Sequence, residues 1–292
     1  MKYPTYLFFI SALCALISIS RCYSQQTDAP ILWQVETRDG NVYYGEIITQ
    51  SQEVMRLETE SLGVINLAVE NIKNVREVRP EELRDDNVWP SNAQATRYFI
   101  APNAYGLRKG EAYYQNGLIF FNQASIGITD NFSMGLGMVP LFLFAGAPTP
   151  VWITPKFSVP VIEDKLNLGG GALIGTVIGE DVGAFGLAYG VVTVGDRNTN
   201  LNLGVGYGFA DGEWGDLPLL HIGGMKRIGR RGYLLSENYL ITTGGEAAGL
   251  ISIGGRTLWN RFSLDYGAFI PVVGTGSFFA FPWVGFVIPL GK

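Results

Sequence analysis

His221 is the only histidine in this sequence and the residue most suited to acid–base chemistry. A histidine acts as the general base of a serine hydrolase when a serine and an orienting acid or amide lie beside it. Ser236, Glu237 and Asn238, on the next predicted strand, offer these residue types. The pattern admits a membrane-embedded lipid hydrolase or acyl-modifying enzyme that uses His221. No other motif in the sequence places an activated nucleophile beside this histidine. We therefore expect a hydrogen-bonded histidine and no catalytic residue.

Four charged residues are isolated within predicted strands that are otherwise poor in charge: Lys156, Glu237, Arg256 and Asp265. In a membrane barrel such residues face the lumen, where they pair with one another or line a pore and set its selectivity. We expect an interior ladder of ion pairs. The parity of Glu237 is ambiguous, because Tyr233, Leu235 and Tyr239 share its face and have the character of lipid-facing residues.

The sequence has few features of a metal-binding or nucleotide-binding site. One histidine and two cysteines, Cys14 and Cys22, do not supply the usual ligands of a transition metal, so we expect no metal and no cofactor. The glycine runs 169–171 and 204–208 lack the G-x-G-x-x-G spacing and a Walker lysine. We interpret them as glycines of strands.

Residues 1–24 have the pattern of a secretory signal peptide. Lys2 gives a positive start, an uncharged apolar run covers 7–20, and small residues precede a cut after Ser24. Lipidation at Cys22 is the alternative, although Arg21 is unusual before a lipidated cysteine. Cleavage after Ser24 would leave a mature chain without cysteine, and therefore without disulfides.

The composition divides the rest of the chain into two parts. In residues 25–95, 19 of 71 residues are charged and three are glycine; in residues 101–292, 25 of 192 are charged and 35 are glycine. An ordinary soluble domain has about 25% charged residues. We predict a small periplasmic β domain over 25–79, a linker over 80–95 and an outer-membrane barrel over 96–292.

The first domain is predicted to be a small barrel of the SH3-like or Sm-like kind. Five short strands fit between residues 32 and 78, and Asp39-Gly40 is a typical hairpin turn. Sm-like folds elsewhere bind RNA, but the net charge here is −5, so no nucleic-acid partner is expected.

Two uncharged segments, 131–155 and 266–291, are long enough for transmembrane helices. Their interior prolines argue against helices, since each costs a helix about 3 kcal/mol. Alternation favours strands instead, with bulky residues on one face and small or polar ones on the other. The bulky positions are Phe132, Met134, Leu136 and Met138; Phe185, Leu187, Tyr189 and Val191; Leu201, Leu203, Val205 and Tyr207; and Phe262, Leu264 and Tyr266.

A secreted sandwich also alternates, but its outer faces need charges to stay soluble, and these strands have few. An all-β chain whose second domain is an antiparallel transmembrane β-barrel fits better, with the bulky face toward lipid. We count about twelve strands, the first over 97–106 and the last over 278–290. Tight charged turns, such as those at 163–165 and 196–198, are typical of the periplasmic end.

Residues 97–116, from Arg97-Tyr-Phe-Ile-Ala-Pro-Asn to Tyr-Gln-Asn116, and residues 127–135 carry a family resemblance. The chain resembles uncharacterised Gram-negative outer-membrane β-barrel proteins that join a short exported β module to a barrel. The resemblance implies fold and location, and no reaction. We therefore expect a structural or narrow-channel protein, with outer-membrane lipid around the barrel and a periplasmic protein as candidate partner of the N-terminal domain.

Overall fold

The computed structural model describes residues 31–78, 82–84, 87–243, 246–259, 261–272 and 279–290. The chain divides into two compact units, Met1–Arg79 and Pro80–Lys292. The predicted signal peptide over 1–24, with both cysteines, lies outside the described residues.

The first unit is one antiparallel sheet of five strands in the order β4-β3-β2-β1-β5. Its elements are β1 (Trp33–Thr37), β2 (Val42–Gln50), β3 (Val54–Thr59), β4 (Gly63–Ala68), the short 3-10 helix η1 (Val69–Asn71) and β5 (Ile72–Glu77). Gly40 has φ 91° in the β1–β2 turn, a conformation that favours glycine. Val35, Met55 and Leu57 form the core of this unit. All five predicted strands are present.

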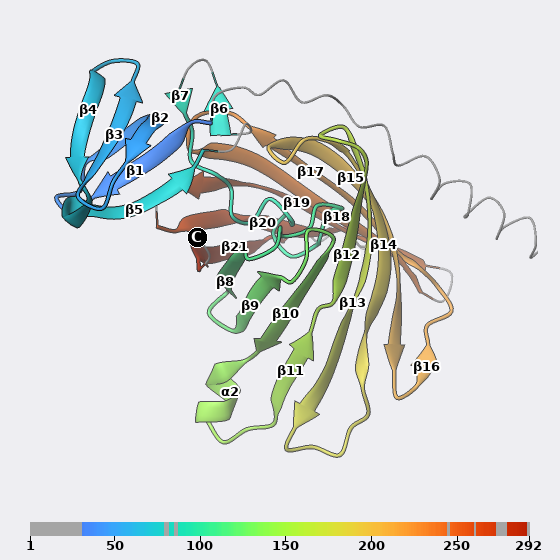
Figure 1. Cartoon of the computed structure of the whole chain (residues 1–292). Helices are drawn as coiled ribbons and strands as arrows, with labels where there is room; N and C mark the ends of the chain where they lie inside the picture. Colours follow the sequence, from blue (N-terminus) through green and yellow to red (C-terminus); the bar gives the residue numbers. More distant parts are fainter. Residues whose placement is uncertain are drawn as a thin grey trace, which may run out of the picture. The chain divides into compact units, whose positions relative to one another are not determined.

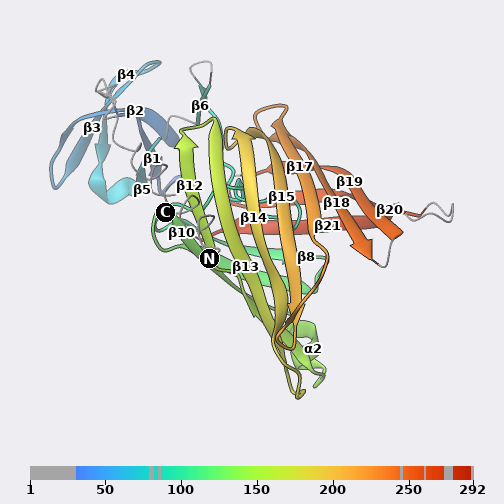
Figure 2. The ribbon, with the colours of Figure 1, turned by 90° about the vertical axis from the view of Figure 1, so that its right-hand side faces the viewer.

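The second unit is a closed antiparallel β-barrel (Figures 1 and 2). Its strands are β8 (Ala112–Gly117), β9 (Phe121–Gly127), β10 (Phe132–Met138), β11 (Thr149–Ile153), β12 (Lys156–Ile162), β13 (Leu166–Ile178), β14 (Phe185–Gly195), β15 (Thr199–Ala210), β17 (Leu219–Arg227), β18 (Gly232–Thr243), β19 (Glu246–Leu258), β20 (Ser263–Val272) and β21 (Phe281–Pro289). In the described part of the chain, β11 and β12 share one position between β10 and β13. The wall therefore has twelve strand positions, which we call staves. The last strand pairs with the first, Gly285 opposite Gly117, and closes the sheet. The predicted fold class and strand number are confirmed.

Short elements decorate the barrel. Strands β6 (Leu83–Arg84) and β7 (Asn87–Val88) form a two-stranded sheet before the barrel, and β16 (Glu213–Trp214) pairs antiparallel with the end of β15. The helix α2 (Pro140–Phe144) lies in the loop between β10 and β11. Within the described residues no helix has the length and apolar character to cross a membrane.

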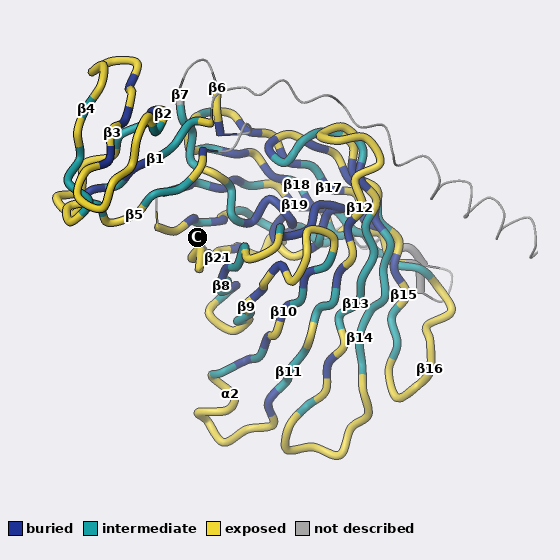
Figure 3. The backbone as a smooth tube through the Cα atoms, viewed as in Figure 1, coloured by how far each residue is buried: buried dark blue, intermediate teal, exposed yellow. Residues whose placement is uncertain are grey.

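The outer face of the barrel is apolar where the alternation predicts it. On β15, Leu201 and Leu203 are 69% and 61% exposed, whereas Asn200 and Asn202, which alternate with them, are buried. Figure 3 shows the same mixture of exposed and buried positions around the wall. A wall with bulky apolar side chains outside and small or polar ones inside suits a lipid environment.

The predicted parity is wrong on β14, and the parity that the sequence left ambiguous on β18 is resolved toward the lumen. On β14, Leu187, Tyr189 and Val191 point to the lumen, since they line its cavity. On β18, Tyr233 and Leu235 are buried in a core cluster inside the barrel. On both strands these side chains meet other apolar side chains inside the barrel, so bulky residues are stable on the inner face as well.

The strand predicted over 97–106 is absent. This stretch forms turns with one isolated bridge, between Arg97 and Pro102, and the first stave is instead β8. Pro102 lacks a backbone N–H and limits ladder formation. The stretch lies inside the barrel, where Figure 1 shows its green trace among the staves.

Candidate functional site in the barrel lumen

Residues 92–107, which we call the internal segment, occupy part of the lumen. From Gln94 to Leu107 nearly every residue is buried. The segment is bound to the tight turns at one end of the barrel: the Tyr105 hydroxyl donates to the Gly195 carbonyl, and the Arg197 guanidinium donates to the Gly106 carbonyl over 2.9 Å. At the opposite end the wall continues toward α2.

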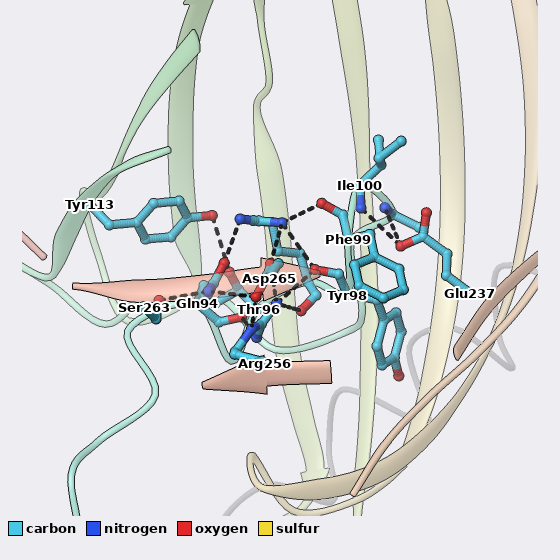
Figure 4. Close-up of polar contacts among 12 residues, drawn as sticks. Gln94, Thr96, Tyr98, Phe99, Ile100, Tyr113, Glu237, Arg256, Ser263 and Asp265 are labelled. Carbon is cyan, nitrogen blue, oxygen red and sulfur yellow. Dashed lines mark hydrogen bonds and ion pairs between the residues drawn. The ribbon is translucent and has the colours of Figure 1, made fainter. Parts of the chain in front are cut away.

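A buried ion pair joins two neighbouring strands beneath the internal segment. Arg256 on β19 and Asp265 on β20 are register partners, and Nε and Nη2 of Arg256 donate to the two carboxylate oxygens over 2.6 and 3.1 Å. This fork geometry is the strongest form of side-chain ion pair. Arg256 also donates to the carbonyls of Gln94 and Tyr98 (Figure 4).

The internal segment contributes its own side chains to this cluster. Nε2 of Gln94 donates to Oγ of Ser263 and to Oδ1 of Asp265, over 2.8 and 3.1 Å. Nη1 of Arg97 lies 3.6 Å from Oδ2 of Asp265. One carboxylate therefore serves two guanidinium groups in a water-poor environment.

Glu237 is fully buried on β18 and points inward. Its Oε2 accepts hydrogen bonds from the backbone N–H groups of Ile100 and Ala101, over 2.9 and 3.1 Å (Figure 4). Its Oε1 accepts from the hydroxyl of Tyr239 over 2.5 Å. The face of β18 whose parity the sequence left ambiguous is thus the lumen face, and the carboxylate binds the middle of the internal segment.

Lys156 on β12 is buried on the other side of the segment. Its ammonium donates to the carbonyl of Thr96 over 3.0 Å and to the carbonyl of Tyr105. The four charges that we predicted for the lumen are all buried there, but only Arg256 and Asp265 bind each other. Lys156 and Glu237 bind the backbone of the internal segment.

His221 is buried on β17, where its Nδ1 lies 3.1 Å from Nδ2 of Asn202. Its ring packs against Tyr98 and Tyr239, with centroids 5.9 and 5.2 Å apart. Ser236 and Asn238 lie on the opposite face of β18, because His221 faces Tyr239 across the ladder and side chains alternate. These two candidate partners therefore point away from the histidine.

The residues that sequence reasoning missed belong to the internal segment, above all Gln94, Arg97 and Tyr98. The hydroxyl of Tyr98 donates to Asn200 of β15 over 2.7 Å. The one available signal was Arg97, a charge beside an apolar run in a stretch that we assigned to the wall.

A cavity of about 700 Å³ lies in the lumen beside the internal segment. Its lining runs from the internal segment to α2 and is mainly apolar, including Ile100, Phe121, Phe142, Leu173, Leu187, Tyr189 and Trp283. Across the described ranges, no group of three or more His, Cys, Asp or Glu residues is arranged to hold a metal ion.

Comparisons with known proteins add little to this description. No protein family and no curated protein matches the chain. One solved structure that does match is described as "Outer-membrane expressed OmpT of Vibrio cholerae", with 11% identity, a TM-score of 0.30, and coverage of 89% of this chain and 94% of that chain. Neither the identity nor the TM-score supports an inference from that protein to this one.

The architecture itself defines the class. A closed, twelve-stave antiparallel barrel with an apolar outer face is a β-barrel of the outer-membrane type. In this barrel part of the lumen is filled by the chain's own internal segment.

Proposed function

We propose that this protein is a structural, non-catalytic outer-membrane barrel whose lumen is closed by its own internal segment. One observation carries the proposal: buried side chains from four different strands, Lys156, Glu237, Arg256 and Asp265, all bind residues 92–107. A segment held by so many buried polar contacts is costly to displace, because each broken contact leaves a buried charge unpaired. The narrow-channel alternative would require that displacement.

The wall of the barrel supports an outer-membrane location. Exposed apolar side chains around the staves suit the hydrocarbon of a bilayer, and closure pairs the backbone groups that lipid cannot satisfy. Together with the predicted signal peptide, this supports the outer membrane as the site of the barrel. The first unit would then lie in the periplasm.

We further infer that the first unit is an SH3-like or Sm-like module that binds a periplasmic protein. Its support is the five-stranded sheet in which β5 returns to pair with β1, together with the 3-10 helix before β5. An enzymatic role has weaker support, since Ser236 and Asn238 point away from His221.

Planar-bilayer recording tests the proposal. The purified full chain should give no discrete conductance steps, whereas a variant whose residues 92–107 are replaced by an equally long Gly/Ser segment should give them. The change in gel migration on heating checks that both proteins are folded. Discrete steps from the unaltered protein would contradict a closed barrel and favour the channel.

A further inference from the structure

The lumen cavity has the character of a ligand pocket. Its volume of about 700 Å³ lies within the range of small-molecule sites, roughly 300–1,000 Å³. Ile100 of the internal segment is 55% exposed although its sequence neighbours Phe99 and Ala101 are buried, and it lines this cavity. Leu173 and Leu187 of the wall line it too. Apolar side chains around a space of this size favour an apolar occupant.

Positive charge gathers where the cavity meets the internal segment. Arg97 and Lys156 both line it. The carboxylate of Asp265 is shared between Arg97 and Arg256, and across the described residues Lys156 has carbonyl partners but no carboxylate within ion-pair distance. Two guanidinium groups and an ammonium thus lie in a lumen that holds, among its described residues, two buried carboxylates, Asp265 and Glu237. The oxygens of Glu237 are occupied by backbone N–H groups and Tyr239. A buried excess of positive charge is unfavourable unless an anion compensates it.

Polar atoms in the lining point to the same kind of ligand. Within the described part of the chain, four buried atoms lack a hydrogen-bond partner and belong to lining residues: Nε of Arg97, Nε2 of His221, Nε1 of Trp283 and Oε1 of Gln115. The Arg97 and Trp283 atoms are donors only. Buried polar groups in native proteins nearly always have partners, so unpaired donors in a pocket mark positions for acceptor atoms.

We propose that this cavity binds the anion of a long-chain fatty acid. The acyl chain lies among the apolar residues between Ile100 and α2, and the carboxylate points to Arg97 and Lys156. The apolar lining explains why the ligand has an acyl chain. The excess of buried cations explains why it carries a carboxylate. Such binding goes beyond a structural role, and it does not depend on whether the barrel conducts ions.

Tryptophan quenching tests the proposal, because Trp283 and Trp152 line the cavity. The full chain is placed in nanodiscs of phosphatidylcholine and titrated with dibromostearate or its methyl ester, with empty discs and the Trp283→Phe variant as references. We expect saturable quenching by the acid, reduced in Trp283→Phe to the part that Trp152 reports, and an apparent affinity at least roughly tenfold lower for the uncharged ester. Quenching no greater than partition into the disc would overturn the proposal.

Two variants separate a ligand site from a merely folded barrel. Lys156→Met should weaken binding of the acid toward that of the ester and leave the ester unchanged; an equal loss for both ligands would overturn the role of the charge. Ile100→Glu places a carboxylate in the cavity and should abolish binding of the acid. The matched change Ile119→Glu, at a loop residue that is 79% exposed, should have no effect.

A third experiment distinguishes a fatty acid from a bilayer phospholipid as the source of the acyl chain. Discs made with brominated phosphatidylcholine should quench Trp283 weakly, because this residue is 7% exposed and points into the barrel. Strong quenching of Trp283 by the disc lipid itself would make the occupant a bilayer phospholipid and overturn the fatty-acid assignment.

Discussion

Glu237 and Lys156 are buried charges whose partners are mainly backbone groups of the internal segment. Charge-assisted hydrogen bonds of this kind are about twice as strong as neutral ones. They also fix the position of a segment that forms no strand of its own. At the scale of residues, the charged side chains of the lumen hold this segment in place.

Asp265 is the residue whose loss should cost most. Asp265→Asn removes the carboxylate that two guanidinium groups share, which leaves Arg256 buried without an anion. We expect the free energy of unfolding to fall by about 3–5 kcal/mol, measured by urea titration of the heat-modifiable gel band. Asp216→Asn, in an exposed loop, is the matched control and should change little.

A double variant checks the reason for that loss. Replacing both Arg256 and Asp265 by leucine removes the unpaired charge, and the stability should recover in part relative to Asp265→Asn. If the double variant is less stable than Asp265→Asn, the hydrogen bonds of Arg256 to the internal segment, rather than its unpaired charge, dominate the effect.

Asp39 in the first unit predicts a pH dependence. Hydrogen bonds from the hydroxyl of Thr37 and from the backbone and side chain of Asn41 lower the pKa of Asp39 below its usual 3.8. Because the pKa is lower in the folded state, its contribution to stability is present above pH 3.8 and is lost as the pH falls through the folded pKa. Asp39→Asn should remove this acid-dependent part, read as amide exchange of Gly40 against pH.

At the scale of elements, the ladder between β18 and β19 is interrupted and repaired by side chains. Backbone pairing stops between Leu235–Gly254 and Tyr239–Leu250. In the gap, Oγ of Ser252 accepts from the N–H of Glu237 over 2.8 Å and donates to its carbonyl over 2.6 Å. The hydroxyl replaces backbone partners next to the carboxylate that holds the internal segment.

Ser252→Ala should loosen this junction. The variant leaves the N–H and carbonyl of Glu237 without these partners, which costs about 1–3 kcal/mol. We expect faster hydrogen exchange at the Glu237 amide with little change in strands far from the gap. Ser263→Ala, which removes a lumen hydroxyl from β20 and leaves this ladder intact, should not alter that amide; equal acceleration in both would contradict the local role.

The strands of the wall could be predicted because period-two alternation and turn residues are local signals. They gave β15 with its faces in the right sense, and the number of staves. The stretch 97–106 could not be assigned correctly, because an apolar run with one arginine is equally typical of a wall strand and of a buried filling. The true first stave is β8, which begins six residues after the end of that stretch.

The orientation of β14 and β18 was not predictable for a related reason. Alternation tells which residues share a face, and not which solvent that face meets. Tyr189 and Leu235 face the lumen because other apolar groups of the chain or cavity lie there. The four charges of the site could be named from sequence, since isolated charges in membrane strands rarely face lipid. Their partners could not, because those are backbone groups far away in the chain.

At the scale of the whole molecule, the closed wall predicts a pattern of protease sensitivity. Arg97 is buried in the lumen, whereas Lys109, twelve residues later, is exposed. In lipid-reconstituted protein, trypsin should cut after Lys109 and spare Arg97, as read by mass spectrometry of the fragments. After heat denaturation both bonds should be cut. Cleavage after Arg97 in the native protein would show that the internal segment leaves the lumen.

The seam between β8 and β21 has a consequence for how the molecule is assembled. The internal segment precedes the first stave, and the barrel closes only when its last strand pairs with that stave. A chain that adds its staves in order around residues 92–107 surrounds them without threading them through either opening. The final pairing is then the moment of capture, so the contents of the lumen are determined before the wall is complete.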